Sequence, residues 1–238
     1  MDYVVATVPR TGSTMLCSLL ARNGAGRPAE HLNPDPAAGG FGAADGSGLS
    51  AEAYVESVRR RERVGGIFGT KVMVHWLDAI RGSRGGTVAD DAEVLVRLFP
   101  DAIYLRLRRL DAVGMAVSHT MALATGEWRG ARRSHPPDRE ITMDEVDANR
   151  RWLLACEERW TELLAEIGAV PYEITYEALS VRPDDVVAGI LDHIGHDGPI
   201  ITTVPETTVQ RGRAASDLRA RYESWLDAES SDAGGEGR

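Results

Sequence analysis

Short apolar segments alternate with longer amphipathic segments along the chain, and this alternation limits the fold more than any other feature. The apolar segments have the length and composition of buried strands, at residues 3–8, 67–74, 102–107 and 170–175. Helical patterns occupy the intervals, at residues 13–23, 51–63, 90–99, 111–125, 142–167, 183–194 and 214–225. Strands that alternate with helices favour parallel pairing, because each crossover returns the chain to the same edge. We therefore expect an α/β fold, with a central, mainly parallel sheet and helices on both faces.

The size and charge of the chain limit the class of protein further. Its 238 residues, 43% of them hydrophobic, fit one globular domain, which we place at residues 1–226. The acidic, glycine-rich segment 227–238 is expected to be a disordered tail. A net charge of −9 argues against a nucleic-acid-binding protein. The chain has no run of 18 apolar residues, no basic leader and only two cysteines. We therefore expect a cytoplasmic protein with reduced thiols and no membrane association.

The turn between the first strand and the first helix has the features of an anion site. Residues 8–14 read Val-Pro-Arg-Thr-Gly-Ser-Thr. Gly12 allows the backbone to approach a ligand closely, and the N–H groups at the helix start can bind an anion together with the Ser13 and Thr14 hydroxyls. Arg10 adds a positive charge. The alternative interpretation is an ordinary turn with a Ser/Thr cap.

This turn differs from the phosphate-binding loop of kinases and nucleotide hydrolases. It lacks the Gly-Lys-[Ser/Thr] ending, since no lysine precedes Ser13. The third strand ends on Arg108 and Arg109, where a kinase would need a magnesium-binding acid. We therefore predict a phosphate site that works without a metal ion. A nucleoside or nucleotide kinase is the alternative, and strict magnesium dependence would favour it.

The turn resembles the 5′-phosphosulfate loop of sulfotransferases, and the chain as a whole resembles the bacterial trehalose sulfotransferase-like family. The resembling segments, in chain order, are residues 9–16, 26–30, 69–73, 108–111, 116–118 and 127–130, and the surroundings of Tyr176. The resemblance implies a P-loop-like sulfotransferase fold. It implies transfer of a sulfuryl group from 3′-phosphoadenosine-5′-phosphosulfate (PAPS) to a small-molecule acceptor, with the bisphosphate PAP as product and no metal ion. It also implies a homodimer.

The resemblance assigns residues to the donor. Those expected at the 5′-phosphosulfate are Arg10, Thr11, Gly12, Ser13 and Thr14. Either Arg109 or Arg108 would hold the 3′-phosphate together with Ser118, since a bidentate arginine suits a phosphate. Arg211 and Gly212 would belong to a loop that closes over the same phosphate, and Tyr176 would lie near the adenine. The alternatives are a Ser118 that bonds to its own helix backbone and a Tyr176 that only packs.

In-line sulfuryl transfer needs a base for the acceptor's proton and cations where charge grows on oxygen. Many sulfotransferases carry Lys-x-His on the second strand, and this chain has Lys71-Val72-Met73, without the histidine base. The resemblance to trehalose sulfotransferases makes Glu30 the base, with Lys71 and Arg10 at the sulfuryl group. A solvated Glu30, a surface Lys71 and a non-catalytic PAP-binding protein are the alternatives.

Three further residues are expected near the acceptor. Arg27 stands where the trehalose enzymes carry an acid, and it would suit an acceptor with an anionic or polar end. His31 lies beside Glu30 and could contact substrate or tune that acid. His75 would lie on the same face as Met73 if the strand continued, so it could replace Glu30 as base; His119 is another histidine that could do so. The expected acceptor is a hydroxyl of a small metabolite of glycosidic or nucleoside type.

Overall fold

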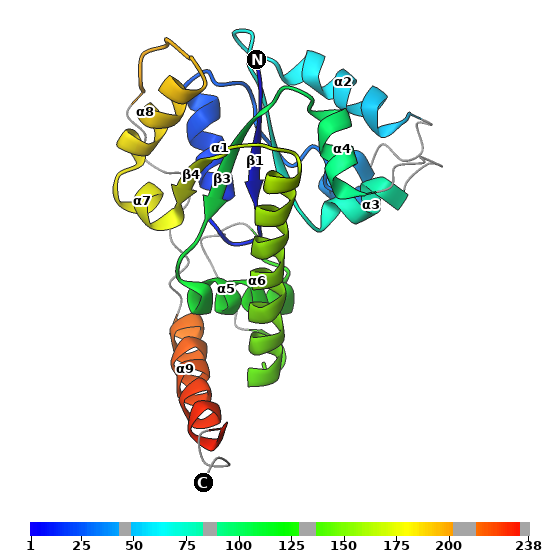
Figure 1. Cartoon of the computed structure of the whole chain (residues 1–238). Coiled ribbons are helices and arrows are strands. Elements are labelled where there is room, and N and C mark those ends of the chain that lie inside the picture. Colours follow the sequence, from blue (N-terminus) through cyan, green and yellow to red (C-terminus); the bar gives the residue numbers. More distant parts are fainter. Residues whose placement is uncertain (43–48, 83–89, 129–136, 202–212, 234–238) are drawn as a thin grey trace. The chain divides into compact units, whose positions relative to one another are not determined.

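The structure is a computed structural model, and it describes residues 1–42, 49–82, 90–128, 137–201 and 213–233. Over these residues the elements follow the expected alternation (Figure 1). The strands are β1 (Asp2–Thr7), β2 (Phe68–Met73), β3 (Ile103–Arg108) and β4 (Tyr172–Thr175). The helices are α1 (Ser13–Arg22), η1 (Pro36–Ala38), α2 (Ala51–Glu62), α3 (Trp76–Gly82), α4 (Asp91–Leu98), α5 (Ala112–Thr125), α6 (Met143–Glu166), α7 (Tyr176–Val181), α8 (Pro183–His193) and α9 (Arg213–Ala233). The four predicted strands and seven predicted helices are confirmed.

The four strands form one sheet in the order β2-β1-β3-β4, and every neighbouring pair is parallel. In this register Val5 of β1 lies beside Lys71 of β2 and Leu105 of β3. Thr7 lies beside Met73 and Leu107, so the carboxyl ends of β1, β2 and β3 meet at one edge of the sheet. Ligands of open α/β sheets bind outside this edge. The predicted α/β fold with a parallel central sheet is confirmed.

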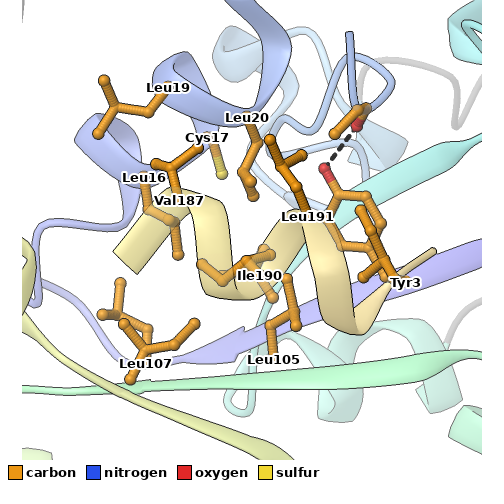
Figure 2. Close-up of a cluster of buried hydrophobic side chains, with 14 of the residues drawn as sticks. Tyr3, Leu16, Cys17, Leu19, Leu20, Leu105, Leu107, Val187, Ile190 and Leu191 are labelled. Atoms are coloured by element: carbon orange, nitrogen blue, oxygen red, sulfur yellow. Dashed lines mark hydrogen bonds between the residues drawn. The ribbon is translucent and has the colours of Figure 1, made fainter. Parts of the chain in front are cut away.

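One face of the sheet packs against α1, α7 and α8. Tyr3 and Val5 of β1 and Leu105 and Leu107 of β3 point to this face, as alternate residues of a strand do. They meet buried side chains of the three helices, which are mainly leucine, isoleucine and valine (Figure 2). The Tyr3 hydroxyl donates a hydrogen bond of 2.7 Å to the carbonyl of Ala25, just after α1. The core therefore fixes α1 directly over the strand that precedes it.

The opposite face is covered by the later part of α6. Trp160 is fully buried, and its Nε1 donates to the carbonyl oxygen of Thr7 at 2.8 Å. Arg106 of β3 is also buried and pairs with Glu157 of α6. At the side of the sheet, α2 and α3 pack against β2, and α4 packs against both helices. Helices therefore lie on both faces, as expected.

The chain divides into two compact units, one of residues 1–110 and 156–206 and the other of residues 111–155 and 207–238. The first contains the sheet. In the second, α5 and α9 are joined by an ion pair of 2.7 Å between Asp111 and Arg219, and the Tyr222 hydroxyl donates to Asp147 of α6 at 2.6 Å. The predicted single domain at residues 1–226 stays a prediction. None of the described helices is both long and apolar enough to cross a bilayer.

Three helical segments depart from the sequence expectation. The second strand ends at Met73 and α3 begins at Trp76, because Trp76, Leu77 and Ile80 bury one face of a helix. The short helix α7 begins directly after β4. Helix α9 continues to Ala233, beyond the helix end expected at residue 225, and the disordered tail at residues 227–238 stays a prediction. Residues 227–233 contain alanine and glutamate and no glycine or proline, which suits a helix. Residues 234–238 lie outside the described part.

Candidate active site

The turn after β1 presents the N-terminus of α1 at the carboxyl edge of the sheet. Gly12 is the N-cap of α1, in the left-handed conformation with φ +82°, and no side chain of the described residues caps this end. The first bond of the helix runs from the N–H of Leu16 to the carbonyl of Gly12 at 3.1 Å. The N–H groups of the first turn have no partner within any α-helix, so they can bind an anion. The Ser13 side chain is buried and that of Thr14 is exposed.

Gly12 also allows a close contact with Tyr176, the first residue of α7. A Cβ atom at position 12 would lie 2.6 Å from Cδ2 and 3.0 Å from Cε2 of the Tyr176 ring. No side chain fits at that distance, so the position requires glycine for space as well as for its backbone conformation. Tyr176 therefore packs directly on the turn, and its place near the adenine stays a prediction.

Two arginines lie side by side at the turn. The Arg109 guanidinium donates to the carbonyl of Arg10 at 3.3 Å, and it lies 4.9 Å from the centre of the Tyr176 ring. Burial, and next the positive charge of Arg109, lower the pKa of Arg10. Because like charges repel, two arginines held together in a half-buried place are typical of a site for an anion.

Arg108 takes a different direction from Arg109. Its Nε lies 3.3 Å from Oε2 of Glu157, on the face of the sheet that α6 covers. The same carboxylate binds the buried Arg106, which also donates to the Glu157 carbonyl at 3.0 Å. Of the two arginines that the sequence left as alternatives, the structure brings Arg109 to the turn and pairs Arg108 with α6.

Lys71 and Glu30 form an ion pair beside the first turn of α1. Lys71 is buried on β2, and its Nζ lies 2.6 Å from Oε1 of Glu30 and 3.5 Å from the Thr14 hydroxyl. The N–H of Lys71 donates to the carbonyl of Ala29 at 2.9 Å, so the segment that carries Glu30 runs along β2. The candidate base and the candidate cation of the transfer step are therefore in direct contact.

Asn33 is a site residue that the sequence reasoning missed. Its side-chain amide donates to Oε2 of Glu30 at 3.2 Å, and its backbone N–H donates to the Glu30 carbonyl at 3.0 Å. The two residues thus form a tight turn that orients the carboxylate. The Asn-Pro pair at residues 33 and 34 predicts only the turn that follows, in which the N–H of Asp35 donates to Oδ1 of Asn33 at 2.9 Å.

Cys17 lies buried on α1 near the ion pair, and it is a free thiol, as is Cys156. Burial is the largest cause that raises the pKa of Cys17 to about 11; the charge of Lys71 acts in the opposite direction. Because the thiolate is the reactive form, Cys17 is a poor nucleophile at neutral pH.

The acceptor roles of Arg27, His31 and His75 stay predictions. Arg27 is exposed. A ring nitrogen of His31 lies 3.2 Å from the Arg27 carbonyl, and the His31 ring stacks on Phe68 with 6.1 Å between centres. His75 was expected to share a face with Met73 only if the strand continued, and β2 ends at Met73, so that condition is not met. His75 lies in the turn before α3. Burial lowers the pKa of His31 and of His75.

Ser118 and His119 belong to α5 of the second unit. His119 is buried, its Nδ1 lies 3.2 Å from Oδ1 of Asn149, and its ring contacts those of Trp128 and Trp152. Ser118 is half-buried, and its binding to the 3′-phosphate stays a prediction. Arg211 and Gly212, the residues predicted to close over that phosphate, lie outside the described residues.

Comparison with known proteins agrees with the resemblance that the motifs indicate. The sequence model of a family described as "Stf0 sulphotransferase" matches residues 2–224. The chain is also similar to trehalose 2-sulfotransferase of Mycobacterium tuberculosis (strain ATCC 35801 / TMC 107 / Erdman). The two are 26% identical over 255 aligned positions, which cover 92% of this chain and 93% of the relative. Because the match includes the turn, the Glu30 segment and all four strands, this chain is a sulfotransferase and belongs to the Stf0 sulphotransferase family.

Proposed function

We propose that this enzyme transfers a sulfuryl group from PAPS to a hydroxyl of a small metabolite of glycosidic or nucleoside type. The observation that carries the proposal is the 2.6 Å ion pair between Lys71 and Glu30 beside the N-terminus of α1. It joins a proton acceptor, a cation and an anion-binding helix end in one place, as an in-line transfer requires.

In this proposal the donor binds along the turn. The N–H groups at the start of α1, the Thr14 hydroxyl and the Arg10 guanidinium hold the 5′-phosphosulfate. Arg109 holds the 3′-phosphate, which its contact with Arg10 supports. Tyr176 packs on Gly12 and receives the adenine on its other side.

The transfer step uses the ion pair. An acceptor oxygen attacks sulfur, the bond from sulfur to the bridging phosphate oxygen breaks, and PAP leaves with that electron pair. Glu30 takes the acceptor's proton, held in position by Asn33. Lys71 is close to both Glu30 and Thr14, so its ammonium can move toward the bridging oxygen as negative charge develops there.

The relative's name makes trehalose the first acceptor to test, and Arg27 argues for a different one. An exposed guanidinium at this position suits an anionic or strongly polar group on the acceptor. A panel of trehalose, other glycosides and nucleosides, each with and without an added phosphate or carboxylate, would locate the preference.

The first experiment is calorimetric titration with PAP, with ADP as control and without magnesium. We expect PAP to bind at least tenfold more tightly than ADP, because the 3′-phosphate gains charge-assisted hydrogen bonds from Arg109. Sulfation of an acceptor from the panel would then complete the test. Equal affinity for PAP and ADP, or binding that depends strictly on magnesium, would overturn the proposal and favour a kinase.

A further inference from the structure

We propose that Thr7 is a positioning residue for the donor-binding turn and that it acts through Thr11. The inference rests on the proposed function, because it concerns how the PAPS site keeps its shape. Thr7 is the last residue of β1, and Thr11 lies in the turn; both are fully buried, at 0% exposure. Their hydroxyl oxygens are 2.6 Å apart. Thr11 was expected among the residues at the 5′-phosphosulfate, and a fully buried hydroxyl that is bonded within the protein suits support of the turn.

Both hydroxyls also lie next to backbone carbonyl groups. Thr7 Oγ1 lies 2.9 Å from the carbonyl oxygen of Leu107, to which it can donate. Thr11 Oγ1 lies 3.0 Å from the carbonyl oxygen of Val8, and either hydroxyl can donate across the 2.6 Å contact that joins them. A chain of hydrogen bonds therefore runs from β3 through Thr7 to the turn.

The turn needs such support because its backbone is unfavourable. Arg10 has φ +69° and is, over the residues that the structure describes, the only non-glycine residue with a positive φ. Gly12 has φ +82°. Left-handed backbone is uncommon for residues other than glycine, and it persists where the surroundings impose it. Thr11 lies between these two residues. Its buried hydroxyl therefore anchors the turn between the two positions that have a left-handed backbone.

Thr7 also connects the turn to the candidate 3′-phosphate site. Leu107, which accepts from Thr7, precedes Arg109 by two residues, and Arg109 in turn donates to the carbonyl of Arg10. The carbonyl of Thr7 is held from the other face by Trp160. Thr7 thus bonds to the strand that precedes Arg109 and itself ends the strand that precedes Arg10, the two arginines that the proposed function assigns to the two phosphates of the donor.

The competing explanation is that Thr7 is an ordinary strand residue, since threonine suits strands. Valine has nearly the same shape and an equal preference for strands, so Thr7→Val separates the two explanations. It removes the hydroxyl and leaves the Leu107 carbonyl without its donor. Thr7→Ser keeps the hydroxyl, so its exchange rates and PAP affinity should stay close to those of the wild type. Thr161→Val, which removes a hydroxyl bonded to the Glu157 carbonyl on α6, is the control.

Two measurements test the inference, and the first needs no nucleotide. Amide hydrogen exchange of residues 10–14 in the free protein should be at least fivefold faster in Thr7→Val than in wild type, and unchanged in Thr161→Val. The dissociation constant for PAP should rise about tenfold in Thr7→Val, as expected for a lost buried hydrogen bond, and return to within threefold of wild type in Thr7→Ser. The double variant Thr7→Val/Thr11→Val should bind PAP no more weakly than Thr11→Val, because both changes break one chain of bonds.

The outcomes separate the two proposals. If wild type does not bind PAP, the proposed function fails, and the exchange rates still decide whether Thr7 orders the turn. The proposed role of Thr7 would be overturned if the amides of residues 10–14 exchanged in Thr7→Val at the wild-type rate. It would also be overturned if the losses of PAP affinity were additive in the double variant. If Thr7→Val does not fold, Thr11→Val breaks the same contact from the turn side and must show the same two effects.

Discussion

Substitution of Gly12 by alanine tests the close packing of Tyr176 on the turn that we propose binds the donor. The added Cβ has two unfavourable effects, a backbone strain and a steric clash. An L residue at φ +82° costs about 1–2 kcal/mol relative to glycine. The Cβ would also lie 2.6 Å from Tyr176 Cδ2, about 1 Å closer than an ordinary carbon–carbon contact of roughly 3.5–4.0 Å. The ring must therefore move.

Movement of Tyr176 also affects Arg109. The guanidinium lies 4.9 Å from the ring centre, and a cation–π contact of this kind contributes about 0.5–1 kcal/mol. The strain and the lost contact together amount to about 1.5–3 kcal/mol. If this energy is lost from donor binding, PAP affinity falls roughly 10- to 140-fold, since each 1.4 kcal/mol is tenfold.

The assay combines PAP calorimetry with urea unfolding, and Gly168→Ala is the matched control. Gly168 has φ +67° and no atom within 4 Å of an added Cβ, so alanine there adds backbone strain without a clash. We expect the control to unfold about 1–2 kcal/mol more easily and to bind PAP as wild type does. In the variant Gly12→Ala/Tyr176→Leu, the loss of stability should be smaller than the sum of the single losses, because the clash is gone. Wild-type PAP affinity in Gly12→Ala would refute this reasoning.

Three further substitutions test the site and the fold. Glu30→Gln removes the proposed base at nearly constant shape, so single-turnover sulfuryl transfer should slow about 10²- to 10³-fold while PAP affinity stays within threefold; Glu166→Gln, at the exposed end of α6, should leave both unchanged. Arg109→Lys should weaken PAP binding about tenfold or more and ADP binding little, whereas Arg108→Lys should change PAP binding less than threefold. Glu145 binds Arg139 and the N–H of Thr142, which lower its pKa from 4.5 to about 2. Its folded-state pKa is depressed, so its contribution to stability is present above about pH 4.5 and is lost as the pH falls toward 2. The difference in unfolding midpoint between wild type and Glu145→Gln should therefore shrink over that interval, and a constant difference would contradict the assignment.

Features that depend on a few neighbouring residues were predictable from the sequence. The strand, glycine turn and helix at residues 3–23 are set by local apolar pattern and by the backbone freedom of Gly12. The box of Thr142 and Glu145 at the start of α6 is present, with bonds of 3.0 and 3.2 Å in the two directions. These features depend on interactions between residues that are close in the sequence, so distant residues are not needed to predict them.

Contacts between distant segments were not predictable in the same way. The motifs gave Glu30 and Lys71 separate roles, but only the path of the Glu30 segment along β2 brings the carboxylate to the ammonium. Helix α3 was missed because its seven residues are too few to show a clear helical period, and Trp76 and Leu77 follow the apolar run of β2 closely. The helical part of the tail was missed because its composition suited disorder as well as a solvated helix.

The sequence alone left open whether Arg108 or Arg109 holds the 3′-phosphate, and the structure shows the reason. Both follow the same strand, and both could reach a phosphate. Arg106 and Arg108 are two residues apart, so they share one face of β3, and on that face α6 presents Glu157. Glu157, the acid that binds Arg108, lies 49 residues further along the chain, and no local sequence pattern indicates this pairing. Arg109 follows the end of the strand and turns toward Arg10 instead. A buried carboxylate on α6 thus pairs with Arg108, and Arg109 is the arginine that lies at the turn, which is why we propose it for the 3′-phosphate.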